Sequence, residues 1–78
     1  MTYQEYFKKI RTEFQSASQK YLEAENELFN NGFQNINLLQ KYAKAKVEFE
    51  NAANLYNTYI DFVSRYNINP SEEMIKLE

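Results

Sequence analysis

Residues 28–38 read LFNNGFQNINL and contain Gly32, the only glycine of the chain. Glycine takes backbone conformations with positive φ at little cost, so it is typical of the residue that follows a helix. Heptad patterns of apolar residues run away from this stretch in both directions. The sequence therefore predicts a turn at residues 31–35 between two long helices. We expect Phe33 to contact Leu28 across the end of the first helix, as in a Schellman ending.

Upstream of the turn, apolar residues recur at alternating spacings of four and three, which is typical of a coiled-coil seam. They are Tyr3, Phe7, Ile10, Phe14, Ala17, Tyr21, Ala24 and Leu28. Thr2 and Glu5 have the spacing of a capping box, in which each residue satisfies a backbone amide of the other. The sequence predicts a helix over about residues 3–30.

Downstream of the turn, the same spacing returns. The residues are Leu38, Tyr42, Ala45, Phe49, Ala52, Tyr56, Tyr59, Val63 and Tyr66. Asn35 or Asn37 is suited to the N-cap position. The sequence predicts a second helix over about residues 36–67. Pro70 then separates this helix from an appendix at residues 69–78, which we expect to form a short helix or a frayed tail.

The two apolar seams are complementary when the chain is folded back at residues 31–34. Aromatic residues then meet alanines in four layers: Ala24 with Tyr42, Tyr21 with Ala45, Ala17 with Phe49, and Phe14 with Ala52. Large-against-small packing fills space without overpacking. The predicted fold class is therefore all-α, a long antiparallel helical hairpin resembling a coiled coil. Its expected seam comprises Phe7, Ile10, Phe14, Ala17, Tyr21, Ala24, Tyr42, Ala45, Phe49 and Ala52.

Charged residues support the same alignment. Glu23, Glu25 and Glu27 lie near the end of the first helix, and Lys41, Lys44 and Lys46 lie near the start of the second. Each group is at the unfavourable end of its own helix dipole, but in a hairpin the two groups become neighbours. At the other end of the hairpin, we expect Asp61 to pair with Lys8 or Lys9.

The amino-acid composition limits the classes of function that the chain can have. The 78 residues form one small domain with a net charge of −2 and neither cysteine nor histidine. The absence of cysteine excludes thiolate metal sites. The absence of histidine removes the side chain that most often serves as a metal ligand or as a general base. We therefore expect no enzyme, no cofactor, no metal site and no small-molecule substrate. Apolar runs are at most two residues long, so we expect neither a membrane span nor a signal peptide, and a cytoplasmic location.

A single hairpin buries only one stripe of each helix, and short chains usually need a further source of stability. We expect a second hairpin to pack on the wide apolar face of the second helix and complete a four-helix bundle. The alternatives are that aromatic residues and the tail cover this face, or that a helix of another protein occupies it. The candidate interaction face comprises Leu39, Ala53, Leu55, Tyr56, Tyr59, Ile60, Phe62 and Tyr66.

By elimination, the sequence predicts a protein–protein interaction module, a small homodimeric adaptor or scaffold. A second hypothesis is an inhibitor or regulator docking on a larger host protein, because compact, mildly acidic chains without motifs are typical of phages and mobile elements. A third is an RNA-binding hairpin dimer that uses the one basic run, Lys8, Lys9 and Arg11. The net charge of −2 argues against a nucleic-acid partner.

Overall fold

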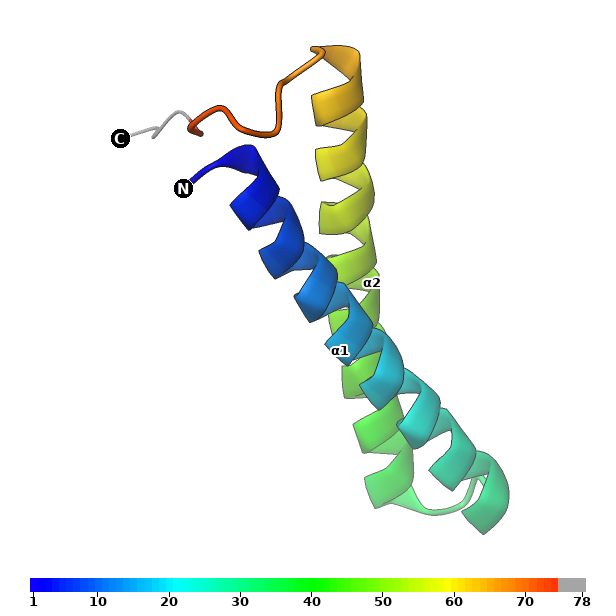
Figure 1. Cartoon of the computed structure of the whole chain (residues 1–78). Coiled ribbons are helices and arrows are strands. Elements are labelled where there is room, and N and C mark those ends of the chain that lie inside the picture. Colours follow the sequence, from blue (N-terminus) through cyan, green and yellow to red (C-terminus); the bar gives the residue numbers. More distant parts are fainter. Residues whose placement is uncertain (75–78) are drawn as a thin grey trace.

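The computed structural model describes residues 1–74 and consists of two helices, α1 (Tyr3–Asn31) and α2 (Ile36–Arg65). They run antiparallel and pack against each other as a hairpin (Figure 1). The predicted all-α hairpin is confirmed. The molecule is elongated, with extents of 49 × 23 × 20 Å. The two helix ribbons diverge toward the end that holds residues 1–10 and 55–74 (Figure 1), which we call the open end.

Both helices begin as the sequence predicts. The Glu5 backbone amide donates to the Thr2 hydroxyl, and the Thr2 amide donates to the Glu5 carboxylate, each over 3.2 Å. This reciprocal pair is the expected capping box. At the start of α2, the Asn35 side-chain oxygen accepts from the amides of Asn37 and Leu38. Of the two candidate caps, the structure therefore uses Asn35.

The helix ends differ from the prediction. Gly32 has the expected positive φ of 81°, but its ψ of 158° is extended, so the expected left-handed ending is wrong. Phe33 instead lies against Phe29, with ring centroids 5.4 Å apart. The Schellman bond occurs at the end of α2, where Asn67 has φ 50° and the Ile68 amide donates to the Val63 carbonyl.

The chain beyond α2 crosses to the start of α1. We call residues 66–74 the C-terminal strap (Figure 1). Residues 69–74 form no helix, and α2 ends at Arg65 rather than near residue 67. The strap instead makes an isolated antiparallel bridge between Glu73 and Thr2. The rest of the predicted appendix, residues 75–78, lies outside the described residues.

The seam residues all lie on the faces where the helices meet, and all are at least partly buried. The α1 rings alternate with the α2 rings. Tyr21 contacts Tyr42 and Phe49, with centroids 5.5 and 5.0 Å away. Ala45 lies midway between these two residues on α2 and is buried, which agrees with the expected alignment. The rings also touch one another, however, so the layers are not simply one aromatic residue against one alanine.

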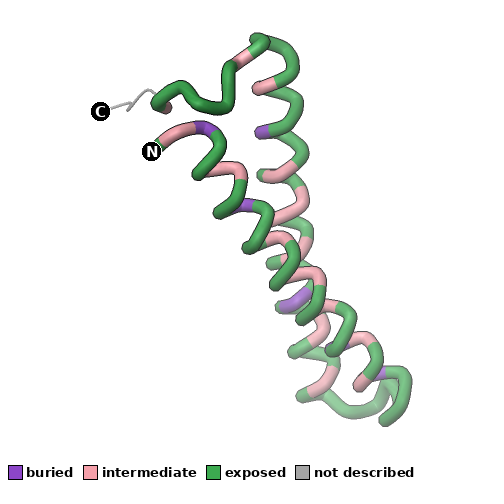
Figure 2. The backbone as a smooth tube through the Cα atoms, viewed as in Figure 1, coloured by how far each residue is buried: buried purple, intermediate pink, exposed green. Residues whose placement is uncertain are grey.

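Few of residues 1–74 are buried. They are Tyr3, Ile10, Ala24, Leu28, Ala45 and Tyr59 (Figure 2). The largest buried cluster is at the open end, where Tyr3, Ile10 and Tyr59 pack together with Ile68 and Met74 of the strap. The core is therefore thin along the hairpin and thickest where the strap closes it.

Ion pairs confirm one charge prediction and correct another. Lys41 Nζ lies 2.9 Å from Glu27 Oε1 and joins the two helices near the turn. Asp61 pairs with Arg65 over 3.0 Å, so its expected pairing with Lys8 or Lys9 is wrong. The reason is geometric. Asp61 follows the seam residue Tyr59 by two positions, about 200° around the helix, and therefore faces away from α1.

Candidate interaction surface at the open end

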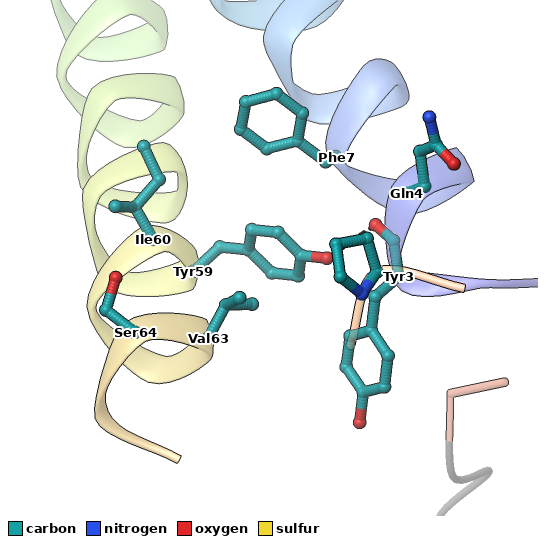
Figure 3. A pocket seen from close by; sticks show the side chains of 8 residues that line it. Tyr3, Gln4, Phe7, Tyr59, Ile60, Val63 and Ser64 are labelled. Carbon is teal, nitrogen blue, oxygen red and sulfur yellow. Dashed lines mark hydrogen bonds between the residues drawn. The ribbon is translucent and has the colours of Figure 1, made fainter. Parts of the chain in front are cut away.

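Tyr59 is at the centre of the open end. Its ring is buried, and its hydroxyl donates to the backbone carbonyl of Tyr3 (Figure 3). The rings of Tyr6 and Phe7 lie 5.1 and 6.2 Å from it. Burial raises the pKa of Tyr59, and the neighbouring Tyr3 and Tyr6 add to the shift. The neutral phenol is thus used as a structural donor between the two helices.

The C-terminal strap completes the N-terminus of α1. The amide of Tyr3 donates to the Glu72 carbonyl over 3.0 Å, and the amide of Gln4 donates to the Pro70 carbonyl over 2.9 Å. The first amides of a helix have no partner within the helix. The strap and the capping box together satisfy the first three amides of α1.

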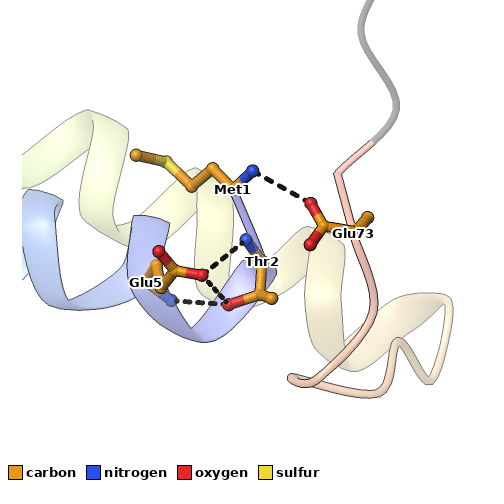
Figure 4. Close-up of polar contacts among 4 residues, drawn as sticks. All are labelled: Met1, Thr2, Glu5 and Glu73. Carbon is orange, nitrogen blue, oxygen red and sulfur yellow. Dashed lines mark hydrogen bonds and ion pairs between the residues drawn. The ribbon is translucent and has the colours of Figure 1, made fainter.

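Two further contacts join the strap to the chain start. The Met74 amide donates to the Met1 carbonyl over 3.0 Å, and the Met1 ammonium lies 2.9 Å from the Glu73 carboxylate (Figure 4). On the adjacent turn, hydrogen bonds from the Thr2 amide and hydroxyl lower the pKa of Glu5. The strap therefore connects the chain beyond α2 to the start of α1, mainly through backbone hydrogen bonds.

Two grooves lie on either side of Tyr59. The first, the Leu55 groove, has a volume of about 450 Å³ and is lined by Tyr3, Tyr6, Leu55, Thr58, Tyr59, Phe62 and Met74. The second, the Ile60 groove, has a volume of about 340 Å³ and is lined by Tyr3, Gln4, Phe7, Tyr59, Ile60, Val63, Ser64 and Pro70 (Figure 3). Each groove receives one strap residue, Met74 or Pro70.

The candidate interaction face is divided by this geometry. Leu55 and Ile60 lie about 140° apart around the axis of α2, at 3.6 residues per turn. Leu55, Phe62 and Tyr66 are on one side of the hairpin, and their side chains are 41%, 42% and 64% exposed. Leu39, Ala53 and Ile60 are on the other side. Tyr56 is half-buried against Phe7 and Phe14, and Tyr59 is buried inside the hairpin, where its side chain lines both grooves.

The heptad seams do not account for all of the apolar surface. Tyr6 and Met74 line the Leu55 groove, although neither belongs to a heptad seam. At the turn, the exposed rings of Phe29 and Phe33 lie against each other, and Ile36 is exposed as well.

Residues 1–74 contain few side-chain groups suited to a metal, nucleic-acid or catalytic site. No cluster of carboxylates within this range has the arrangement of a metal site. Lys8, Lys9 and Arg11 are exposed on α1. A hydrogen bond between the hydroxyls of Tyr21 and Tyr42, 3.2 Å apart, raises the pKa of Tyr21 to about 12. Neither of the two described helices combines the length and apolar character needed to cross a membrane.

Comparison with known proteins adds no relative. No protein-family model, curated protein or solved structure matches the chain.

Proposed function

We propose that the protein is a non-enzymatic protein–protein interaction module, a small adaptor or scaffold that acts as a homodimer. The observation that carries the proposal is its exposed surface of 6206 Å². A compact monomer of 9.4 kDa exposes about 5,000 Å². The difference, about 1,200 Å², exceeds the area of about 800 Å² that each partner buries in an interface of standard size.

The type of side chain exposed also supports association. Among residues 1–74, eleven large apolar side chains are at least 38% exposed, including Leu55 and Phe62 beside a groove. Of these, Leu55 and Phe62 line one groove, and Phe62 contacts the exposed Tyr66 ring; a contiguous apolar surface of this kind marks interaction sites in soluble proteins. Association with a second hairpin would bury it and complete a four-helix bundle.

The test is the mass in solution, measured by light scattering after size exclusion over a concentration series. We expect about twice 9.4 kDa. Leu55→Asp and Phe62→Asp should shift the mass toward the monomer. Asn54→Asp, at an exposed position beside Leu55, is the matched control and should not. A mass that stays at 9.4 kDa at every concentration overturns the homodimer.

A further inference from the structure

The two grooves at the open end differ in polarity. Six of the seven residues that line the Leu55 groove are Tyr, Leu, Phe or Met, and none of the seven is charged. The Ile60 groove includes the polar side chains of Gln4 and Ser64. Tyr, Phe and Met are enriched in the cores of protein interfaces, where charged residues are depleted. The Leu55 groove therefore has the composition of an interface core.

The spacing along α2 suits a twofold interface. Leu55 and Phe62 are seven residues apart and lie on the same side of the helix, with Thr58 and Tyr59 midway between them. An antiparallel copy of α2 crossing at that midpoint would place each Leu55 against the other copy's Phe62. Thr58 is the smallest side chain lining the groove, and it is exposed. Two helices can approach closely there.

Tyr66 extends the apolar surface of Leu55 and Phe62 by one further turn of α2. The ring of Tyr66 lies 5.2 Å from that of Phe62, so the two form one continuous apolar surface. In the same antiparallel arrangement, Tyr66 of one copy comes level with Asn51 of the other. The exposed Asn51 side chain would then face the Tyr66 hydroxyl at the edge of the interface. A central apolar region with a polar margin is the usual anatomy of such contacts.

Charge favours the antiparallel arrangement over a parallel one. Beyond the groove, toward the turn, Lys20, Glu23, Lys41, Lys44 and Glu48 gather on one surface. In a parallel dimer, Lys44 would meet the Lys44 of the second copy, and such a like-charge contact is costly. In the antiparallel arrangement only the open ends overlap, so these charged surfaces lie far apart.

We infer that two copies pack face to face through their Leu55 grooves, with the two α2 helices antiparallel around a twofold axis at Thr58. This inference rests on the proposed homodimer and specifies its interface. Such an interface is self-complementary, because each residue that contacts a second residue is contacted by it in turn.

The absence of cysteine from the chain makes the test direct. Thr58→Cys places one thiol beside the proposed axis, and Ser64→Cys places one in the Ile60 groove as a matched control. Both positions are exposed. Each variant is treated with a short bismaleimide, because a direct disulfide requires Cα atoms less than about 7 Å apart. We expect Thr58→Cys to form a covalent dimer and Ser64→Cys to remain mostly monomeric on a denaturing gel.

Light scattering of the same two variants before crosslinking separates the two hypotheses. If both are dimers but Ser64→Cys crosslinks preferentially, or neither crosslinks, the assigned interface is overturned and the homodimer stands. If Thr58→Cys is a monomer in solution while Ser64→Cys is a dimer, Thr58 belongs to the interface, as inferred. If both variants and the unmodified chain are monomers, the proposed function itself fails.

Discussion

The hydroxyl of Tyr59, near the end of α2, donates a hydrogen bond to the backbone carbonyl of Tyr3 in the first turn of α1. The two residues are 56 positions apart in the chain. Their contact joins the ends of both helices where the hairpin is otherwise widest. Around it lie the largest buried cluster and the two grooves. Several properties of the open end should therefore depend on this one phenol.

Tyr59→Phe should lower the free energy of unfolding by about 1 kcal/mol, because it keeps the ring and removes one buried hydrogen bond. The measurement is urea denaturation followed by circular dichroism. Tyr66→Phe is the control, since the Tyr66 ring is 64% exposed. Equal effects of the two substitutions would contradict the role assigned to the Tyr59 hydroxyl.

Alkaline pH should destabilise the hairpin through Tyr21. The pKa of Tyr21 is raised from its ordinary value of 10.0 to about 12, chiefly by the hydrogen bond with Tyr42. A raised pKa in the folded state means that folding favours the neutral phenol. The contribution of Tyr21 to stability is thus fully present below pH 10 and is lost between pH 10 and about 12.

The Tyr42→Phe variant tests this cause separately. Without the Tyr42 hydroxyl, the pKa of Tyr21 should fall toward 10.0. Titration of the tyrosinate absorbance, with Tyr21→Phe as the reference that identifies the signal, measures the shift. An unchanged titration in Tyr42→Phe would show that the hydrogen bond does not control Tyr21.

Ala45→Phe should destabilise the fold by about 1–3 kcal/mol, because the larger side chain overpacks the seam. Ala45 is 8% exposed and lies between Tyr42 and Phe49, whose rings both contact Tyr21. Ala43→Phe, on the exposed side of α2, corrects for the lower helix propensity of phenylalanine. A neutral effect at Ala45, relative to Ala43, would mean that the alignment of the helices is different.

The ion pair between Lys41 and Glu27 should specify pairing more than it stabilises the fold. Both side chains are about half exposed, so the pair contributes about 0–1 kcal/mol. Lys41→Glu should lower the melting temperature slightly, and adding Glu27→Lys should restore it. Thermal unfolding in low and high salt measures both effects. If the double variant were as unstable as the single one, the pairing across the helices would be disproved.

The helices were predictable because their signals are local and periodic. The capping box joins Thr2 and Glu5, which are three positions apart, and neighbouring residues of each heptad seam are three or four positions apart. Both features are present in the structure. The helix endings were less predictable, because both Gly and Asn accept positive φ. The structure uses Asn67 for the Schellman bond that the sequence suggested at Gly32.

The C-terminal strap and the grooves were not predictable. The strap depends on backbone hydrogen bonds between residues nearly 70 positions apart, for which the side-chain pattern carries no signal. The division of the candidate face depends on which side of the seam each residue takes. For Leu55 and Ile60 the spacing does indicate this side, because helix geometry puts them about 140° apart on opposite flanks of the seam, and the structure places them in separate grooves.

The amides of Tyr3 and Gln4 have partners that the first turn of a helix ordinarily lacks. In most helices such amides exchange their protons with solvent rapidly, because nothing shields them. Here their exchange requires the strap to detach from α1. Deuterium uptake at these two positions therefore reports how often the strap opens, and fraying of α1 and release of residues 70–72 become a single cooperative event.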